Sequence, residues 1–397
     1  MPDKLPFEFL FTPEFSRNPY AVYAPLRGEG PVFPIDFPPG FEAYLIIDHE
    51  HGRAALNDPR LSKDMQRFGD YFKAIATEDD LLFDANMLSS DPPDHTRLRR
   101  IVSKAFTPRR VEELRPRVQQ ITDELIDAFA GGRAELLDAF AFPLPIIVIC
   151  ELLGVPPEDR DLFREWSALL VNPTFEPDEV ERRRAAARAT TGYFRDLTEQ
   201  RRAAPRDDLI SALVSQDELT EKELLSTLSL LLIAGHETTV NLIGNGVLAL
   251  LRNPGQLELL RARPELLPNA VEEFLRYDGP VERSTPRFAA EDLEIAGTRI
   301  PRGAMVHISL GAVGRDPAVV AAPDTLDITR ADTRHLAFGH GIHFCLGAPL
   351  ARMEGQIAIG TLLDRLPGLA LGCAEEELSW RLTGSVVRGL AALPVRF

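Results

Sequence analysis

The segment 219–254 constrains the fold more than any other part of the 397-residue chain. It opens with LTEKE, in which Thr220 and Glu223 have the spacing of a helical capping box, and it closes at Asn253-Pro254. At a rise of about 1.5 Å per residue, roughly 32 residues predict a helix about 48 Å long over 221–252. Its side chains are apolar nearly all round, which predicts that this helix is buried in the protein core.

The rest of the chain is mostly helical in pattern, with short strand signals toward both ends. Apolar residues recur at helical spacing in the segments 108–130, 133–153, 158–170, 178–203, 255–262 and 266–277. The strand patterns are AYLIIDHEH near residue 43, MVHISLGAV near residue 305 and VVRGLAALPVRF at the C-terminus. The chain has neither a linker-like segment nor an internal repeat. We therefore expect a mainly α protein with small β-sheets, folded as a single domain over 1–397.

The centre of the long helix reads AGHETT, which is unusual for a buried segment. Ala234 and Gly235 remove side-chain bulk there, while Glu237, Thr238 and Thr239 place a carboxylate and two hydroxyls beside them. A charge at this position argues against a transmembrane helix, because it is costly in lipid. Two interpretations remain open: a helix kink with a satisfied polar cluster, or a groove that delivers protons over a flat cofactor.

Composition excludes some classes of function. The formal net charge of -16 argues against general affinity for nucleic acid or anionic membranes. The N-terminal sequence MPDKLPFEFLFTPEF has neither the pattern of a secretory signal nor that of a membrane anchor, so we expect a cytoplasmic protein. Three cysteines are too few for a disulfide framework. Cys150 lies in the apolar run FPLPIIVIC and is expected to be a buried, inert thiol, whereas Cys373 is uninformative.

Cys345 stands in a different context, FGHGIHFCLGAPLAR. Glycines 339, 341 and 347 permit a tight backbone around the sulfur. A helix is expected to start directly afterwards, with Pro349 in its first turn, and a helix N-terminus favours the thiolate form of cysteine. An alternative is a zinc site formed by His340, His343 and Cys345.

One segment is strongly basic although the protein is acidic. Between Arg97 and Arg117 a local formal charge of +6 results from eight basic residues and from Glu112 and Glu113. The basic residues are Arg97, Arg99, Arg100, Lys104, Arg109, Arg110, Arg115 and Arg117. This segment is either a solvated helix face or a docking surface for an acidic partner.

Several motifs, in the right order along the chain, resemble those of the cytochrome P450 superfamily, specifically its bacterial soluble branch. FGHGIHFCLG resembles the haem-binding loop, and AGHETT looks like the oxygen-activation motif of the central helix. EFLR, with Glu273 and Arg276, is similar to the Glu-x-x-Arg pair, and DPPDHTRLRRIVSKAF is similar to the helix that clasps the haem propionates. The motifs look closest to actinobacterial members that tailor macrolides and related polyketides or hydroxylate sterols.

The resemblance implies a P450 fold in which haem b lies between the central helix and the Cys-bearing loop. It implies that Cys345 is the axial thiolate, that Thr238 and Glu237 bind oxygen and relay protons, and that Glu273 and Arg276 form a buried structural pair. The other haem contacts that it implies are the propionate donors His95, Arg99, Arg287 and His343, and the ring contacts Ala234, Gly235, Phe338 and Gly339.

The activity implied by the resemblance is monooxygenation with O2 of a large, mostly hydrophobic small molecule. The sequence carries no convincing dinucleotide fingerprint, so electrons are expected from a ferredoxin and its reductase, with the acidic ferredoxin docking on the basic segment. We expect a monomer with no nucleic-acid or membrane partner. The alternative is a haem-thiolate enzyme that uses peroxide or rearranges its substrate.

The substrate pocket implied by the resemblance is lined mostly by apolar residues. The candidates are Leu82, Met87, Leu88, Ile233, Val281, Arg283, Ser284, Val386 and Val387. Arg283 is unusual among them, and it either faces solvent or meets an oxygen atom of the substrate.

Overall fold

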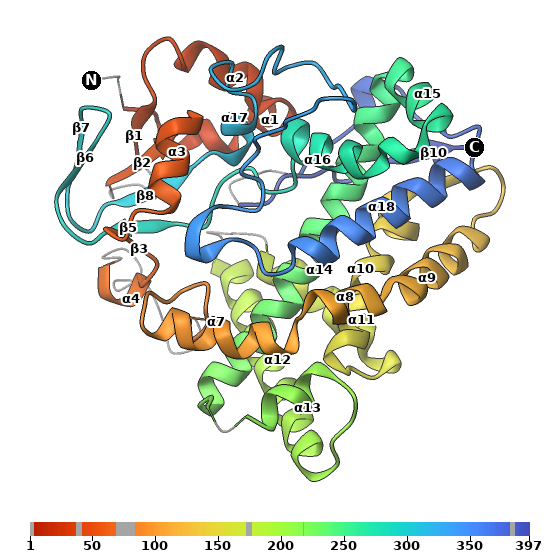
Figure 1. Cartoon of the computed structure of the whole chain (residues 1–397), viewed down its shortest axis with the longest axis horizontal. Helices are drawn as coiled ribbons and strands as arrows, with labels where there is room; N and C mark the ends of the chain where they lie inside the picture. Colours follow the sequence, from red (N-terminus) through yellow and green to blue (C-terminus); the bar gives the residue numbers. More distant parts are fainter. Residues whose placement is uncertain (1–3, 37–41, 69–83, 172–176, 217, 382–385) are drawn as a thin grey trace. The chain divides into compact units, whose positions relative to one another are not determined.

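The computed structural model describes residues 4–36, 42–68, 84–171, 177–216, 218–381 and 386–397. The chain forms two compact units. Unit 1 comprises residues 1–61, 116–144 and 238–397, and unit 2 comprises residues 62–115 and 145–237. Figure 1 traces the elements of both units along the chain.

Unit 1 contains the sheets and the helices that follow them. Its helices are α1 (Pro13–Arg17), α2 (Pro19–Leu26), α3 (His49–Leu56), most of α9 (Arg115–Asp127), the second half of α14 (Glu221–Arg252), α15 (Pro254–Ala262), α16 (Leu267–Asp278), α17 (Leu310–Gly314) and α18 (Ala348–Arg365). Its strands are β1 (Val32–Asp36), β2 (Glu42–Ile46), β4 (Arg133–Glu135), β5 (Arg287–Ala289), β6 (Leu293–Ile295), β7 (Thr298–Ile300), β8 (Met305–Ile308), β9 (Ala370–Leu371) and β10 (Pro394–Arg396).

The largest sheet has the strand order β1-β2-β8-β5-β3, with β3 (Leu61–Ser62) at its edge. β1 pairs antiparallel with β2, whereas β2 pairs parallel with β8, with Ile46 opposite Ile308. Ile46, Val306 and Ile308 are fully buried and belong to one hydrophobic cluster with the side chains of α3 and α17. Burial of these β-branched side chains anchors α3 and the segment before Cys345 to the sheet.

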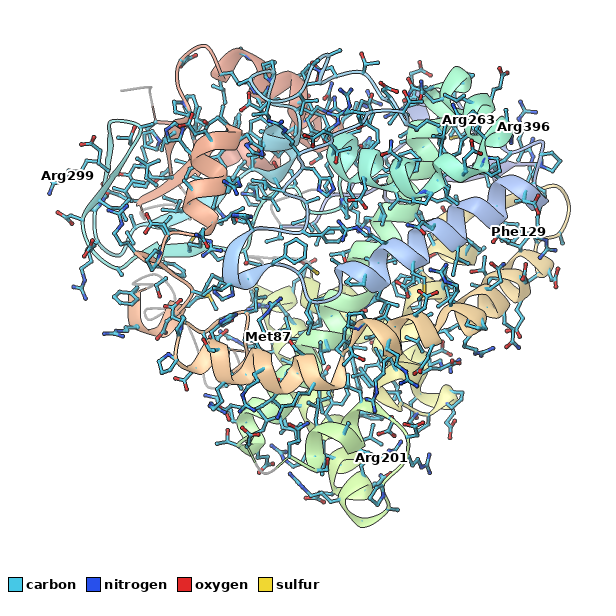
Figure 2. All side chains as sticks on the ribbon, in the orientation of Figure 1. Met87, Phe129, Arg201, Arg263, Arg299 and Arg396 are labelled. Atoms are coloured by element: carbon cyan, nitrogen blue, oxygen red, sulfur yellow. The ribbon has the colours of Figure 1, made fainter. Side chains whose placement is uncertain are left out.

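The described residues of unit 2 form helices and their connecting loops, and Ser62 belongs to β3. Its elements are α4 (Met65–Phe68), α7 (Asp94–Ala105), α8 (Pro108–Glu113), most of α10 (Pro143–Leu153), α11 (Arg160–Val171), α12 (Pro177–Ala203), α13 (Leu209–Val214) and the first half of α14. α11 packs on α12 through aromatic rings, with the Phe163 and Tyr193 centroids 4.9 Å apart in an edge-on arrangement. The Nε of buried Arg201, labelled in Figure 2, donates to Asp208 Oδ2 at 2.6 Å.

The helix α14 confirms the sequence expectation over its whole length. It spans Glu221–Arg252 without interruption, and it contributes residues to both units. The capping box is formed, because the Glu223 amide donates to Thr220 Oγ1 at 3.3 Å and the Thr220 amide donates to Glu223 Oε2 at 2.9 Å. Among the residues that the structure describes, no helix combines the length and apolar composition needed to cross a bilayer.

The segment 133–153 differs from the single helix expected there. It contains β4, which pairs with β10, then a π-helical turn at Leu137–Ala141, and then α10. The carboxylate of Glu135 accepts the amides of Leu137 at 3.2 Å and Asp138 at 2.6 Å, which starts the turn locally. The spacing of apolar residues predicts neither the cap formed by Glu135 nor the pairing of β4 with the distant strand β10.

Two of the expected strands are shorter than their sequence patterns. β8 ends at Ile308, because Ser309 Oγ accepts the amide of Ala312 at 3.0 Å and begins α17. At the C-terminus only Pro394–Arg396 forms a strand among the described residues, and Val387 and Leu390 make isolated bridges to Val281 and Trp380.

Candidate active site

Cys345 ends a tight loop that begins at Phe338. The amide of Cys345 donates to the carbonyl of Phe338 at 2.9 Å and closes the loop. Gly339 and Gly341 have φ angles of +74° and +75°, a region that favours glycine. A Cβ atom at Gly341 would also lie 2.5 Å from Asn57 Oδ1. These two glycines confirm the expected tight backbone.

Gly347 does not share this role. Its φ is -79°, an ordinary helical value, and a Cβ atom there would meet Cys345 Sγ at a van der Waals distance of 3.8 Å. The expectation of unusual backbone geometry at Gly347 is therefore wrong. The helix α18 begins at Ala348 with Pro349 in its first turn, as expected.

The three cysteines differ sharply in their surroundings. Cys150 is fully buried, and burial raises its pKa to about 12, which confirms the expected inert thiol. Cys373 is half-buried, and its pKa is raised by burial and by the nearby charges of Glu377 and Glu375. Cys345 alone is exposed. Its sulfur is therefore the most accessible of the three to a bound group.

The structure gives no support to the zinc alternative. Within the described ranges, no group of three His, Cys, Asp or Glu side chains is arranged to hold a metal ion. His340, His343 and Cys345 thus share a loop without forming a ligand set. A single exposed thiol on a glycine-rich loop suits an axial ligand of a planar cofactor better than a zinc site.

The centre of α14 exposes a small side chain in an otherwise buried helix. Ala234 is exposed, and Ile233 and Thr238 are half-buried, whereas residues 224–229 and 239–250 are buried. A Cβ atom at Gly235 would lie 3.0 Å from the side chain of Ile149 on α10, so its missing side chain serves helix packing in unit 2. Ala234 is the residue whose small side chain leaves the surface of the helix open.

The polar groups beside Ala234 are buried and ordered. His236 Nδ1 lies 2.9 Å from the carbonyl oxygen of Leu232, one turn earlier on the same helix. Glu237 is 2 % exposed, and its Oε2 lies 3.7 Å from His236 Nε2. The helix runs without a break from Glu221 to Arg252 through this polar segment.

The expected propionate donors are distributed over both units. His95 and Arg99 lie one turn apart on α7 in unit 2, with His95 buried and Arg99 half-buried. In unit 1, Arg287 is buried on β5, and its Nη1 donates to the carbonyl of Leu61 at 3.4 Å. His343 is half-buried in the loop before Cys345. Basic and donor side chains of this kind suit carboxylate groups of a ligand.

The candidate substrate residues of unit 1 lie side by side. Val281 bridges Val387, and the amide of Glu282 donates to the carbonyl of Val386 at 2.9 Å. Ser284 is buried, and its Oγ accepts the amide of Ile308 at 3.2 Å.

The remaining candidates fall in or near unit 2. Met87, labelled in Figure 2, is buried there, and Leu88 and Ile233 are half-buried. Leu82 lies outside the described residues.

Arg283 does not face solvent, which corrects one of its two expected placements. It is 2 % exposed, and its Nε lies 2.9 Å from Glu282 Oε2. Glu282 also accepts hydrogen bonds from the hydroxyls of Tyr23 at 2.5 Å and Ser309 at 2.8 Å. A charge this deep requires an ion pair, and Glu282 supplies it.

The C-terminal segment beside Val386 and Val387 packs closely on α14. A Cβ atom at Gly389 would lie only 1.7 Å from Asn241 Oδ1. Asn245, one turn further along α14, donates to the carbonyls of Asp278 at 3.1 Å and Arg388 at 3.3 Å. This fixes the backbone next to the candidate substrate residues.

Glu273 and Arg276 form the expected buried pair, and the structure adds a third member. Both side chains are fully buried, and Glu273 receives two hydrogen bonds from Arg276, at 2.7 and 2.8 Å. Arg330 Nε lies 3.2 Å from Glu273 Oε2, and the amide of Asp327 donates to Oε1 at 2.9 Å. Sequence reasoning missed Arg330, because a single arginine in an irregular segment has no periodic pattern.

The basic segment of α7 is largely neutralised by carboxylates from elsewhere in unit 2. Arg97 pairs with Glu223, and both Arg100 and Lys104 pair with Glu218, the latter at 3.8 Å. The local charge of +6 therefore overstates the positive potential of this surface. Counting charges along the sequence missed Glu218 and Glu223, because they are distant from α7 in the chain.

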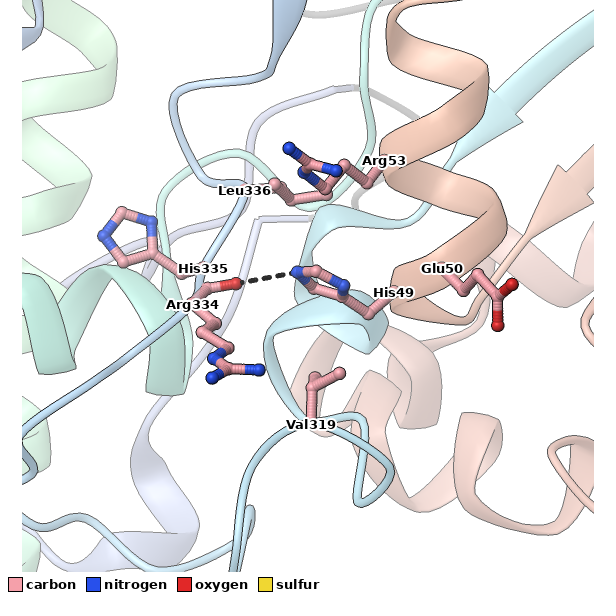
Figure 3. A pocket seen from close by; sticks show the side chains of 7 residues that line it. All are labelled: His49, Glu50, Arg53, Val319, Arg334, His335 and Leu336. Atoms are coloured by element: carbon pink, nitrogen blue, oxygen red, sulfur yellow. Dashed lines mark hydrogen bonds between the residues drawn. The ribbon is translucent and has the colours of Figure 1, made fainter.

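A surface pocket of about 490 Å³ lies elsewhere in unit 1 (Figure 3). Its lining residues are His49, Glu50, Arg53, Val319, Arg334, His335 and Leu336. His49 Nε2 lies 3.0 Å from the carbonyl oxygen of Arg334, as the dashed line shows. None of the candidate substrate residues lines it, so it is not the expected substrate pocket.

Comparisons with known proteins agree with this arrangement. The family model described as Cytochrome P450 matches residues 260–367. The chain is 48 % identical to cytochrome P450 monooxygenase PikC of Streptomyces venezuelae, over 97 % of this chain and 92 % of that protein. It is 45 % identical to 6-deoxyerythronolide B hydroxylase of Saccharopolyspora erythraea, over 95 % of each.

A solved structure shows the same similarity in three dimensions. The tirandamycin C-bound P450 monooxygenase TamI matches with a TM-score of 0.90 and 46 % identity, over 100 % of both chains. Likeness at this level, over nearly the full length, extends to fold and reaction class. The chain belongs to the cytochrome P450 family, and it is a haem monooxygenase of that family.

Proposed function

We propose that this enzyme inserts one oxygen atom from O2 into a macrolide or related polyketide, with Cys345 as the axial ligand of haem b. The exposed sulfur of Cys345 on its glycine-bent loop is the observation that carries the ligand assignment. A thiolate-bound haem supplies the oxidising chemistry. The protein supplies the ligand, the protons and the position of the substrate.

The substrate class is proposed from relatives and from the candidate lining. One relative is named for hydroxylation of 6-deoxyerythronolide B, and TamI was solved with tirandamycin C bound. Val281, Val386 and Val387 present apolar side chains close together, while the charge of Arg283 is already paired with Glu282. A large, mostly hydrophobic molecule suits this lining.

We assign proton supply to Glu237 and Thr238. Thr238 is half-buried next to exposed Ala234, so its hydroxyl can donate a hydrogen bond to an oxygen bound in front of the helix. Glu237 is buried beside His236 and can pass protons toward Thr238. The presence of this acid-alcohol pair favours O2 over peroxide as the oxidant.

We propose that electrons come from an acidic ferredoxin and its reductase. The ferredoxin would approach α7, where the side chains of Arg100 and Lys104 are 48 % and 52 % exposed. The pairing of these residues with Glu218 weakens the positive field but leaves their nitrogen donors at the surface. Arg53, on α3, is an exposed arginine for which the structure gives no ion pair among the described residues, and it is the alternative docking residue.

A difference spectrum of the reduced, carbon monoxide-bound protein tests the ligand assignment. Wild type is expected to show the red-shifted Soret band of a thiolate-bound carbonyl complex, and Cys345→Ser is expected to lose it because no sulfur remains on the loop. Cys150→Ser and Cys373→Ser are the matched controls and should keep the band. Retention of the band in Cys345→Ser would overturn the assignment.

A further inference from the structure

Next to the Cys345 loop, a second glutamate of α16 holds an arginine and a histidine together. Glu272 Oε1 accepts Arg352 Nε at 2.6 Å, and Oε2 accepts Arg352 Nη2 at 2.8 Å. The same Oε2 lies 3.0 Å from His335 Nε2. Burial alone would raise the pKa of Glu272, but the hydrogen bonds from Arg352 and His335 outweigh it and hold the pKa at about 2. Glu272 is therefore charged at any physiological pH.

The hydrogen bonds of His335 define its tautomer. The amide of Ala337 donates to His335 Nδ1 at 3.2 Å, so Nδ1 carries no proton. Nε2 must then carry the proton, which it donates to the carboxylate of Glu272. A neutral histidine leaves one positive charge and one negative charge in the cluster, on Arg352 and Glu272.

Arg352 connects this cluster to the cysteine loop. Its guanidinium carbon lies 4.5 Å from the ring centroid of Phe338, the residue whose carbonyl accepts the Cys345 amide. The hydrogen bonds to Glu272 raise the pKa of Arg352, and the charges of Glu272 and Cys345 add to that effect. Arg352 thus acts on the loop both by cation–π contact and by its charge.

We propose that Arg352 is a positioning residue for Cys345. Glu272 and His335 fix its guanidinium on Phe338, and this contact holds the ligand loop and places a positive charge near the sulfur. The inference rests on the proposed role of Cys345 as axial ligand. In this proposal Arg352 does not touch the iron, but its charge changes the electron density on the Cys345 sulfur that binds the iron.

The charges of Arg352 and Glu272 should change the ferric/ferrous midpoint potential in opposite directions, which a purely structural role would not do. A positive charge near the sulfur favours the reduced iron, so loss of Arg352 should lower the ferric/ferrous midpoint potential. Loss of the Glu272 charge should raise it, because a nearby negative charge disfavours the reduced iron, while the carbonyl oxygen of Gln can still accept a hydrogen bond from Arg352. A purely structural contact predicts the same direction for both changes.

The experiment compares holoproteins of Arg352→Gln, Arg352→Lys, Glu272→Gln and wild type by spectroelectrochemical titration and thermal melting. Arg365→Gln is the matched control, because Arg365 lies on the same helix and pairs with Asp123 and Asp127. We expect a lower potential in Arg352→Gln, a value near wild type in Arg352→Lys and Arg365→Gln, and a higher potential in Glu272→Gln.

Equal or same-direction shifts in Arg352→Gln and Glu272→Gln, with parallel losses of melting temperature, would overturn the proposal. If Arg352→Gln does not fold, Glu272→Gln decides: a potential above that of wild type supports the proposal, and an unchanged or lower potential overturns it. Loss of the thiolate-type carbonyl band in wild type would instead overturn the ligand assignment. The two failures are thus distinguishable.

Discussion

Glu273 on α16 and Glu354 on α18 are both buried in unit 1, yet only Glu273 is surrounded by arginines. Glu273 receives hydrogen bonds from Arg276 and Arg330. Glu354 is 1 % exposed, and burial raises its pKa to about 8, while nearby Thr239 opposes the shift only weakly. The comparison shows that this fold buries one carboxylate as an anion, because cations accompany it, and the other as a neutral acid.

The partners of Arg276 extend beyond Glu273. Its Nη1 donates to the carbonyls of Gly314 at 3.0 Å and Pro323 at 2.7 Å, and its Nη2 donates to that of Thr325 at 3.1 Å. Irregular backbone without its own ladder thus obtains hydrogen bonds from one side chain. Glu354, within an α-helix, has no such task.

The largest expected effect is that of Arg276→Ala. The change leaves the carboxylate of Glu273 buried with less compensation and removes the arginine donor of the Gly314 and Pro323 carbonyls, so we expect a loss of about 3–5 kcal/mol in unfolding free energy. Chemical denaturation followed by circular dichroism measures it. Arg109→Ala, which breaks an exposed pair with Glu113, is the control and should have the unfolding free energy of wild type. Equal unfolding free energies of Arg276→Ala and Arg109→Ala would refute the structural role of the buried pair.

Glu354→Gln should give an intermediate effect that depends on pH. Because the folded-state pKa is about 8 and the ordinary value is 4.5, the unfolded chain releases this proton first, and wild-type stability falls as pH rises between these values. The variant lacks this penalty. Its stability relative to wild type should therefore increase by up to about 1.4 kcal/mol per pH unit from pH 5 to pH 8.

Urea denaturation at pH 5, 6, 7 and 8 measures this slope. Glu113→Gln, an exposed glutamate, serves as the control and should follow wild type at every pH. If Glu354→Gln also follows wild type, Glu354 is ionised in the folded protein, and the contrast with Glu273 disappears.

The smallest effect on stability is expected when an ion pair at the surface is broken. Arg100→Glu breaks the pair with Glu218, which water screens, so melting and the carbonyl spectrum should stay as in wild type. If ferredoxin docks on α7, the same change should slow ferredoxin-supported turnover several-fold and leave peroxide-driven oxidation unchanged. Arg53→Glu is the comparison. Slower turnover in Arg53→Glu alone would move the docking site to α3.

The sequence predicted elements whose determinants are local. The limits of α14 follow from the Thr220–Glu223 box and Asn253-Pro254, and the loop at Cys345 follows from Gly339 and Gly341. These residues act on their neighbours in the chain, so a local pattern records them.

Partners distant in sequence were not predictable. Arg330 reaches Glu273, Glu218 reaches Arg100, and Ile149 explains Gly235, in each case across a long stretch of chain. The burial of Arg283 was not predictable either, although its partner Glu282 is the preceding residue, because the adjacent charges do not show whether the pair lies in the core. Such contacts depend on tertiary packing, and single-sequence patterns do not encode it.

The packing of Gly389 against Asn241 has a consequence for protein engineering. Val386 and Val387 are half-buried, so other side chains at these two positions can extend toward their exposed side in a mutant library. At Gly389 any added side chain would collide with Asn241 Oδ1, so that codon must be kept. Mutagenesis that includes codon 389 would therefore yield misfolded clones at that codon, whereas saturation of the two valines alone tests their proposed contact with substrate on an intact scaffold.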